Sequence, residues 1–219
     1  LASGNVYLEA VLSALYEVIE RDGVSCHYFS AATTSFSSPN VQLETIRYPA
    51  VQELLSRLQH KNIGVLLTDC TVNTDVPIFM ATLWDKQFRH VGITNGYGAH
   101  LDPEVAMLRA LTEAIQSRAV FIAGARDDVF YPQFQLFKKK DNAEEIAALE
   151  QADLTIDASH YRSDATPTLE GDLAILLDKL KKAGLHQALV FDLSRPEFDV
   201  SVVRLVVPGL EGYYSSTYC

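Results

Sequence analysis

Two segments of this 219-residue sequence constrain its fold more than any other feature, because each joins a glycine-bearing turn to an amphipathic helix. In the first segment, 1–22, apolar residues fall on one helical face at about 100° per residue, and charged residues fall roughly opposite. Taken alone, such a charged stripe is most simply the solvated side of a helix. The apolar residues are Leu8, Leu12, Leu15 and Ile19, and the charged ones are Glu17, Glu20 and Arg21.

The second segment, 96–118, repeats this plan. Asp102 is a suitable N-cap, Pro103 suits the first helical turn, and Glu104 lies near the positive end of the helix dipole. The sequence therefore predicts a turn at 96–98 followed by a helix with two stripes. The buried stripe is Leu108, Leu111 and Ile115, and the polar stripe, at i, i+4 and i+7, is Arg109, Glu113 and Gln116.

The residue types on these two polar stripes point to a particular chemistry. Two such helices can bring carboxylates together, and converging carboxylates are the ligands that bound magnesium requires. An arginine among them suits a phosphate, because its planar fork pairs with phosphate oxygens. The pattern is therefore compatible with a magnesium and phosphate site, and two solvated helix faces stay open as the alternative.

Composition excludes several other classes of protein. A formal charge of −10 argues against a general nucleic-acid binder, and the short basic run 138–140 is interpreted as a solvated loop. The three cysteines are too few and too widely spaced for a disulfide framework or a metal-binding pattern. We find no apolar run of membrane-spanning length and no signal peptide, and therefore expect a cytoplasmic protein with no membrane contact.

Hydrophobic patterning predicts an α+β fold with mixed β-sheets and packed helices. We expect the segment 26–40 to be mainly loop, and Asn95-Gly96 to form a turn. The GYG at 96–98 is not a dinucleotide-binding fingerprint, and no P-loop follows it, so neither a Rossmann nor a P-loop motif is present. The other expected helices are 49–59, 142–151 and 168–182, and the expected strands are 63–68, 76–84, 152–157, 187–192 and 201–207.

Several blocks of sequence carry a family resemblance. These are LASGN with EAVLSALYEVIERD, then GYGAHLDPEVAMLRALTEAIQSR followed by AGARDD, and VVRLVVPGLEG at 202–212. In this order they resemble the YcaO family over nearly the whole chain. The resemblance implies an enzyme, dependent on ATP and magnesium, that phosphorylates a backbone amide oxygen of a peptide or protein. A nucleophile then replaces that oxygen and gives an azoline, a thioamide or a related product, as in cyclodehydratases of peptide natural-product (RiPP) biosynthesis.

The resemblance also assigns roles to individual residues. It implies that Glu17, Glu20 and Glu113 hold magnesium. Arg204 is expected on a buried strand, where an unpaired arginine is costly and requires an anion, which is either a nucleotide phosphate or a carboxylate in a structural salt bridge. Arg118 points away from the polar stripe and is interpreted as structural. The nucleotide-binding set is Glu17, Glu20, Arg21, Arg109, Glu113, Gln116 and Arg204, with Ser3, Asn5 and Arg126 as secondary candidates, of which Ser3 and Asn5 are equally explained as helix caps.

The resemblance further implies that 1–219 is a single YcaO-like domain fragment, lacking the family's N-terminal portion and its extreme C-terminus. Expected partners are a peptide or protein substrate, a ubiquitin-activating-type or TfuA-like protein, and a second copy, since relatives are often dimers. Two alternatives stay open. One is a noncatalytic accessory or scaffold protein that assists a ribosomal-protein methylthiolation enzyme, and the other is a degenerate relative that keeps only the fold.

Overall fold

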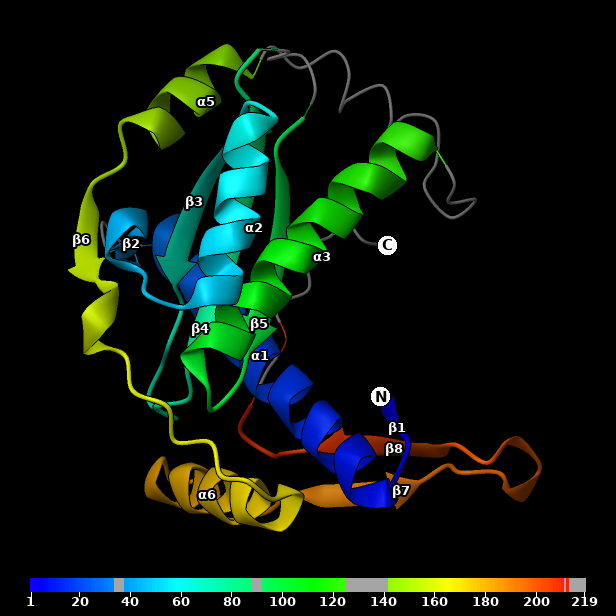
Figure 1. Cartoon of the computed structure of the whole chain (residues 1–219). Coiled ribbons are helices and arrows are strands. Elements are labelled where there is room, and N and C mark those ends of the chain that lie inside the picture. The colour runs from blue at the N-terminus through cyan, green and yellow to red at the C-terminus, as the bar shows by residue number, and fades with distance from the viewer. Residues whose placement is uncertain (34–37, 88–91, 125–141, 211, 213–219) are drawn as a thin grey trace.

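The structure, a computed structural model, describes residues 1–33, 38–87, 92–124, 142–210 and 212. This part contains a five-stranded sheet of order β5-β4-β3-β2-β6 and a three-stranded sheet of order β1-β8-β7 (Figure 1). The strands are β1 Ala2–Gly4, β2 Asn40–Gln42, β3 Ile63–Asp69, β4 Ile78–Asp85, β5 Thr94–Ala99, β6 Leu154–Asp157, β7 Leu189–Asp192 and β8 Ser201–Val206. The α-helices are α1 Tyr7–Thr33, α2 Pro49–His60, α3 Pro103–Ala123, α5 Ala143–Glu150 and α6 Leu169–Lys182.

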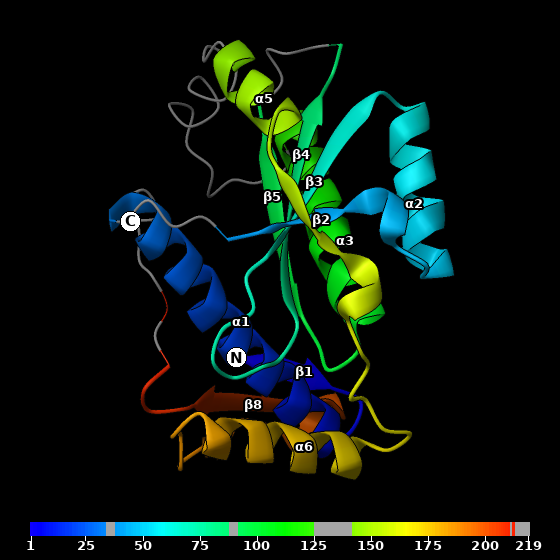
Figure 2. The ribbon, with the colours of Figure 1, turned by 90° about the vertical axis from the view of Figure 1, so that its left-hand side faces the viewer.

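The long helix α1 separates two layers of the molecule. Helices α2 and α3 cover one face of the five-stranded sheet, and α1 crosses the other face (Figures 1 and 2). Strand β4 alternates accordingly, since Phe79 and Ala81 pack with α3 whereas Ile78 and Met80 pack with α1. On its far side α1 meets β8 and α6, and these elements complete a single apolar cluster.

Helix α1 is longer than the sequence suggested. We expected a loop from residue 26, but the helix continues to Thr33, and for 26–33 the loop prediction is wrong. The reason is tertiary packing: at Gly23 a Cβ would lie 2.5 Å from the Ile78 side chain and 2.8 Å from the Cys70 carbonyl oxygen. The glycine therefore permits a close approach to the sheet, and the helix continues across it.

The predicted turns at 1–5 and 96–98 are partly strands. Ala2 in β1 pairs with Val203 in β8, and the Gly96–Gly98 stretch lies inside β5 rather than in a turn. A Cβ at Gly96 would lie 2.1 Å from the backbone nitrogen of Ala114, and one at Gly98 would lie 2.2 Å from the Ala106 carbonyl oxygen. These glycines allow α3 to pack directly onto the β5 backbone.

Local signals placed the remaining helices correctly. The Asp102 carboxylate accepts a hydrogen bond from the Glu104 backbone nitrogen at 2.8 Å, which confirms the predicted N-cap of α3. Thr168 caps α6 in the same way through the Gly171 nitrogen, and Gly184 follows that helix with a φ of 85°. The two β-sheets with helices packed on them form an α+β architecture, which agrees with the expected fold class.

The three-stranded sheet buries only one of its faces. Val203 and Leu205 of β8 point toward α1 and are buried, whereas Arg204 between them is exposed on the opposite face. That face also exposes Leu189 and Phe191 of β7, at 46% and 52%. The expectation that Arg204 lies on a buried strand is therefore wrong, because the strand is covered on one side only.

Candidate functional site

The candidate site lies at the free edge of β5, where α3 and α1 approach from opposite faces of the sheet. An edge strand leaves every second backbone N–H and C=O without a partner strand. Here α3 supplies those partners: the Tyr97 nitrogen donates to Oε2 of Glu113 at 3.1 Å, and Nη1 of Arg109 donates to the Ala99 carbonyl at 3.3 Å. Arg109 and Glu113 of the predicted polar stripe are thus exposed residues that also hydrogen-bond to the sheet edge.

The polar stripe of α1 contains one surface ion pair and one buried carboxylate. Arg21 Nε donates to Glu17 Oε1 at 3.0 Å, and the two side chains are 68% and 44% exposed, so this pair adds less than about 1 kcal/mol to stability. Glu20 is only 8% exposed. It has no hydrogen bond or ion pair to another described residue, which is unusual for a buried carboxylate.

Burial dominates the electrostatics of Glu20. The pKa of its carboxyl is raised from 4.5 to about 8. Desolvation is the largest cause, and the negative charges of Glu17 and Glu113 contribute to the same increase. The charges of Arg109 and Arg21 act in the opposite direction. The charges of Glu17, Glu113, Arg109 and Arg21 thus all act on Glu20, so the polar stripes of α1 and α3 face a common region.

Glu113 faces the same region from α3 but is itself exposed. Desolvation raises the pKa of its carboxyl, the hydrogen bond from Tyr97 lowers it, and the charge of Glu17 raises it again. Only Oε2 of Glu113 is engaged by the backbone within the described part of the chain. The cluster thus contains three carboxylates that repel one another, flanked by two arginines.

These features fit a bound divalent cation with an attached phosphate. A cation relieves the repulsion among Glu17, Glu20 and Glu113 and gives the buried carboxylate a partner, and the guanidinium of Arg109 suits phosphate oxygens. Among the described residues, no three acidic, histidine or cysteine side chains are arranged to hold a metal ion by themselves. Magnesium commonly takes one or two carboxylates together with substrate phosphates and water, so the arrangement agrees with a nucleotide-borne metal.

The structure adds a contact set that the sequence did not predict. Tyr16, one residue before Glu17, is 3% exposed and stacks on His100 with ring centroids 4.6 Å apart. The guanidinium carbon of Arg109 lies 5.7 Å from the centroid of the Tyr16 ring. In the sequence, Tyr16 looks like another residue of the apolar helix face, and His100 lies just before the helix cap. Neither position therefore indicated a functional role.

The other predicted site residues have varied positions. Gln116 continues the α3 stripe and is exposed. Ser3 and Asn5 make no side-chain hydrogen bond within the described residues, although the Asn5 backbone nitrogen donates to Glu9 Oε2 at 2.7 Å at the start of α1. Arg204 points away from α1, on the outer face of the small sheet. Arg126 lies outside the described residues.

Arg118, interpreted as structural from the sequence, pairs with Asp85 at 2.8 Å. Both side chains are largely buried, at 15% and 10% exposed. The pair ties the middle of α3 to the end of β4. This contact explains why Arg118 leaves the polar stripe of α3.

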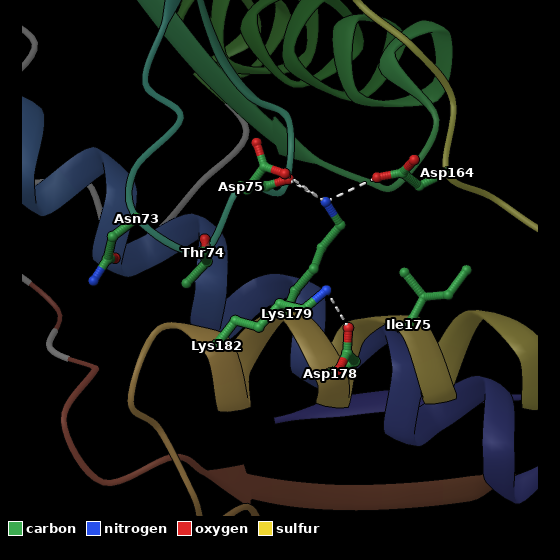
Figure 3. A pocket seen from close by; sticks show the side chains of 8 residues that line it. All are labelled: Asn73, Thr74, Asp75, Asp164, Ile175, Asp178, Lys179 and Lys182. Carbon is green, nitrogen blue, oxygen red and sulfur yellow. Dashed lines mark hydrogen bonds and ion pairs between the residues drawn. The ribbon is translucent and has the colours of Figure 1, made fainter.

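A separate polar pocket of about 390 Å³ lies between the β3–β4 connection and α6 (Figure 3). Its central cation is Lys179, which donates to the Asp75 carbonyl at 2.7 Å, to Asp75 Oδ2 at 2.9 Å and to Asp164 Oδ2 at 2.8 Å. An ammonium has three donors, and all three are used. We therefore interpret Lys179 as a structural link between the two layers and not as a ligand-binding group.

Comparison with known proteins identifies the family of the chain. Residues 1–211 match the family model described as YcaO cyclodehydratase, ATP- and Mg²⁺-binding. The chain is 36% identical over 219 residues to an uncharacterised protein of Methanothermobacter thermautotrophicus, covering 96% of this chain and 55% of that protein. It is 33% identical to a Rhizobium leguminosarum bv. trifolii protein from the tfuA 3′ region, covering 100% of this chain and 53% of that protein.

Solved structures show the same fold. The heterocyclase TruD matches with a TM-score of 0.75 and 30% identity, over 97% of this chain and 29% of that one. YcaO from Methanopyrus kandleri, bound with AMPPCP and Mg²⁺, matches with a TM-score of 0.75 and 25% identity, over 95% of this chain and 54% of that one. The chain spans about half the length of the curated relatives named above. No helix in the described part has the length and apolarity needed to span a bilayer. Sequence and fold agree that the chain belongs to the YcaO family.

Proposed function

We propose that this chain forms part of an enzyme that uses Mg²⁺ and ATP to activate a backbone amide oxygen of a peptide or protein. The observation that carries the proposal is the buried Glu20 carboxylate, which has no partner among the described residues and lies among Glu17, Glu113, Arg21 and Arg109. An added cation stabilises the charged form of such a site beyond what Arg21 and Arg109 supply. The family model and a relative solved with AMPPCP and Mg²⁺ support the same cofactors.

Each residue has a distinct role in this proposal. Glu20 and Glu113 bind the metal, and Glu17 adds negative charge while Arg21 restrains it through their ion pair. Arg109 pairs with phosphate oxygens and stabilises the negative charge on them. Such electrostatic stabilisation is the main contribution that a protein makes to phosphoryl transfer. When bound, Mg²⁺–ATP supplies the phosphoryl group that converts the amide oxygen into a leaving group. Gln116 and Arg204 remain secondary candidates, as do Ser3, Asn5 and Arg126.

The neighbours support a proposal for the product class. Relatives described as heterocyclases, one of them solved with its substrate and cofactor, support azoline formation from a peptide, with thioamide or related products as variants on the same activation step. The relative from the tfuA 3′ region supports a TfuA-like partner protein. We further propose a cytoplasmic protein in which 1–219 is one YcaO-like domain fragment that works with further chain, as the length of its relatives indicates.

A noncatalytic role is the second candidate. One relative, 26% identical over 98% of this chain and 36% of its own length, is named the Escherichia coli ribosomal protein S12 methylthiotransferase accessory factor YcaO. An accessory protein of this kind would keep the nucleotide site as a binding module and leave the chemistry to a partner enzyme. The two proposals differ in whether ATP is consumed when a peptide substrate is present.

Titration calorimetry with Mg²⁺–ATP tests the proposed site. Glu20→Gln and Glu113→Gln should each weaken binding by about 10- to 100-fold, since a charged contact is worth about 1.5–3 kcal/mol. The matched control is Glu53→Gln on α2, which removes an exposed carboxylate from an i,i+4 pair with Arg57 and should leave affinity unchanged. Undiminished binding in both site variants would refute the site. Binding without peptide-stimulated ATP consumption would favour the accessory role.

A further inference from the structure

A continuous set of contacts connects α1, the β5–α3 connection and Arg109. His100 Nδ1 accepts a hydrogen bond from the Asp102 nitrogen at 2.9 Å, so the imidazole is held from its own loop. Its ring stacks on Tyr16 with an interplanar angle of 27°. The Arg109 guanidinium is near the Tyr16 ring, within the range of a cation–π contact. Three side chains from three different segments therefore pack in series.

The same contacts leave most of the Arg109 guanidinium available. Arginine has five N–H donors, and the Ala99 carbonyl uses one of them. Arg109 makes no ion pair with a carboxylate inside the described part of the chain, although its charge acts on Glu20. An arginine that is oriented by an aromatic ring and a carbonyl, but has no acidic partner, is prepared to receive an anion.

We propose that Tyr16 and His100 are positioning residues for Arg109, holding its guanidinium in one orientation at the phosphate side of the site. The inference rests on the proposed function and deepens it, because it explains how the phosphate-binding arginine is fixed before nucleotide arrives. Tyr16 acts through its contact with the guanidinium, and His100 acts by stacking on the Tyr16 ring and holding it in place. Neither residue touches the nucleotide.

A double-mutant cycle on the Mg²⁺–ATP dissociation constant tests this relation. Tyr16→Leu removes the cation–π contact and should weaken binding by about 3- to 30-fold in the wild-type background. In the Arg109→Gln background, the same change should alter affinity by less than about twofold, because the group it positions is gone. Tyr16→Phe keeps the ring and should bind like wild type. Equal losses in both backgrounds would show that Tyr16 acts independently of Arg109 and would overturn the proposal.

Two variants of His100 separate its ring from its hydrogen bond. His100→Phe keeps an aromatic ring to stack on Tyr16 but loses the acceptor for the Asp102 nitrogen. His100→Asn keeps a side-chain acceptor for that nitrogen but loses the stacked ring. The proposal expects the phenylalanine variant to retain affinity and the asparagine variant to lose several-fold. The reverse order would overturn it.

A measurement without nucleotide keeps the inference separate from the proposed function. In NMR spectra, the Arg109 side-chain protons should be shifted upfield by the Tyr16 ring, and the shift should persist in Tyr16→Phe and vanish in Tyr16→Leu. Unshifted resonances in the wild type would refute the positioning role. A shifted arginine in a protein that does not bind Mg²⁺–ATP would instead refute the nucleotide site and leave the contact itself demonstrated.

Discussion

Replacing Glu20 with glutamine tests the electrostatics of the site in the absence of any ligand. The wild-type carboxyl has a pKa raised from 4.5 to about 8, chiefly by burial. A group whose pKa is higher in the folded state contributes its full stability below its unfolded pKa and loses it as the pH rises through the folded value. The wild-type chain should therefore become less stable between pH 5 and pH 8 because of this one side chain.

The size of the effect follows from proton linkage. At about 1.4 kcal/mol per pKa unit, the difference between 4.5 and about 8 corresponds to an upper limit of about 5 kcal/mol. Between pH 6 and pH 8, Glu20 should lower the free energy of unfolding by about 2 kcal/mol. Glutamine has nearly the same shape and no ionisation, so Glu20→Gln should become more stable relative to wild type by that amount over the same interval.

Urea denaturation of both proteins at several pH values measures the difference directly. The histidines with lowered pKa, His27 and His100, are present in both proteins, so their contributions largely cancel in the comparison. Glu53→Gln again controls for the loss of an exposed carboxylate. Parallel stability curves for wild type and Glu20→Gln would refute the reasoning. Saturating Mg²⁺–ATP should also flatten the wild-type curve, because the cation stabilises the ionised carboxylate.

Three further predictions concern stability and use the same denaturation assay. Asp102→Ala should cost about 1 kcal/mol through loss of the α3 cap, whereas Asp102→Asn should retain most of it. Arg118→Met should cost about 1–3 kcal/mol because it removes the largely buried guanidinium that pairs with Asp85 Oδ2, and adding Asp85→Asn should recover part of that loss; an effect below about 0.5 kcal/mol would contradict the buried pair. Lys179→Met should lower the free energy of unfolding by about 1–3 kcal/mol, because it removes the ion pairs with Asp75 and Asp164. The control Lys182→Met changes an exposed lysine and should cost less than about 0.5 kcal/mol, and equal effects would show that Lys179 is not a structural link.

The parts of the fold that the sequence predicted are those determined by local chemistry. Asp102 and Thr168 cap their helices with their own side chains, so a short stretch of sequence is sufficient to place both helix starts. The polar stripe of α3 was predictable because helical periodicity alone puts Arg109 and Glu113 on one face. Family resemblance added the pairing of the two helices, which periodicity could not show.

The parts that the sequence did not predict depend on contacts between distant segments. The Asn95-Gly96 pair resembles a turn locally, yet it forms a strand because β4 pairs with it and α3 packs on it. Arg204 was expected to need an anion because its neighbours are apolar, but only one face of its strand is covered. The stacking of Tyr16 and His100 requires two segments more than eighty residues apart to meet, and no single-sequence pattern records this.

The two glycines of β5 give the site an unexpected mutational sensitivity. Gly96 and Gly98 set how closely the α3 backbone approaches the strand, and the same helix carries Arg109 and Glu113. A methyl group at either position would clash with the α3 backbone and force the helix and the strand apart, moving Arg109 and Glu113 relative to α1. Under the proposed function, alanine variants at Gly96 or Gly98 should therefore weaken Mg²⁺–ATP binding as Glu113→Gln does, although neither glycine has a side chain to contribute.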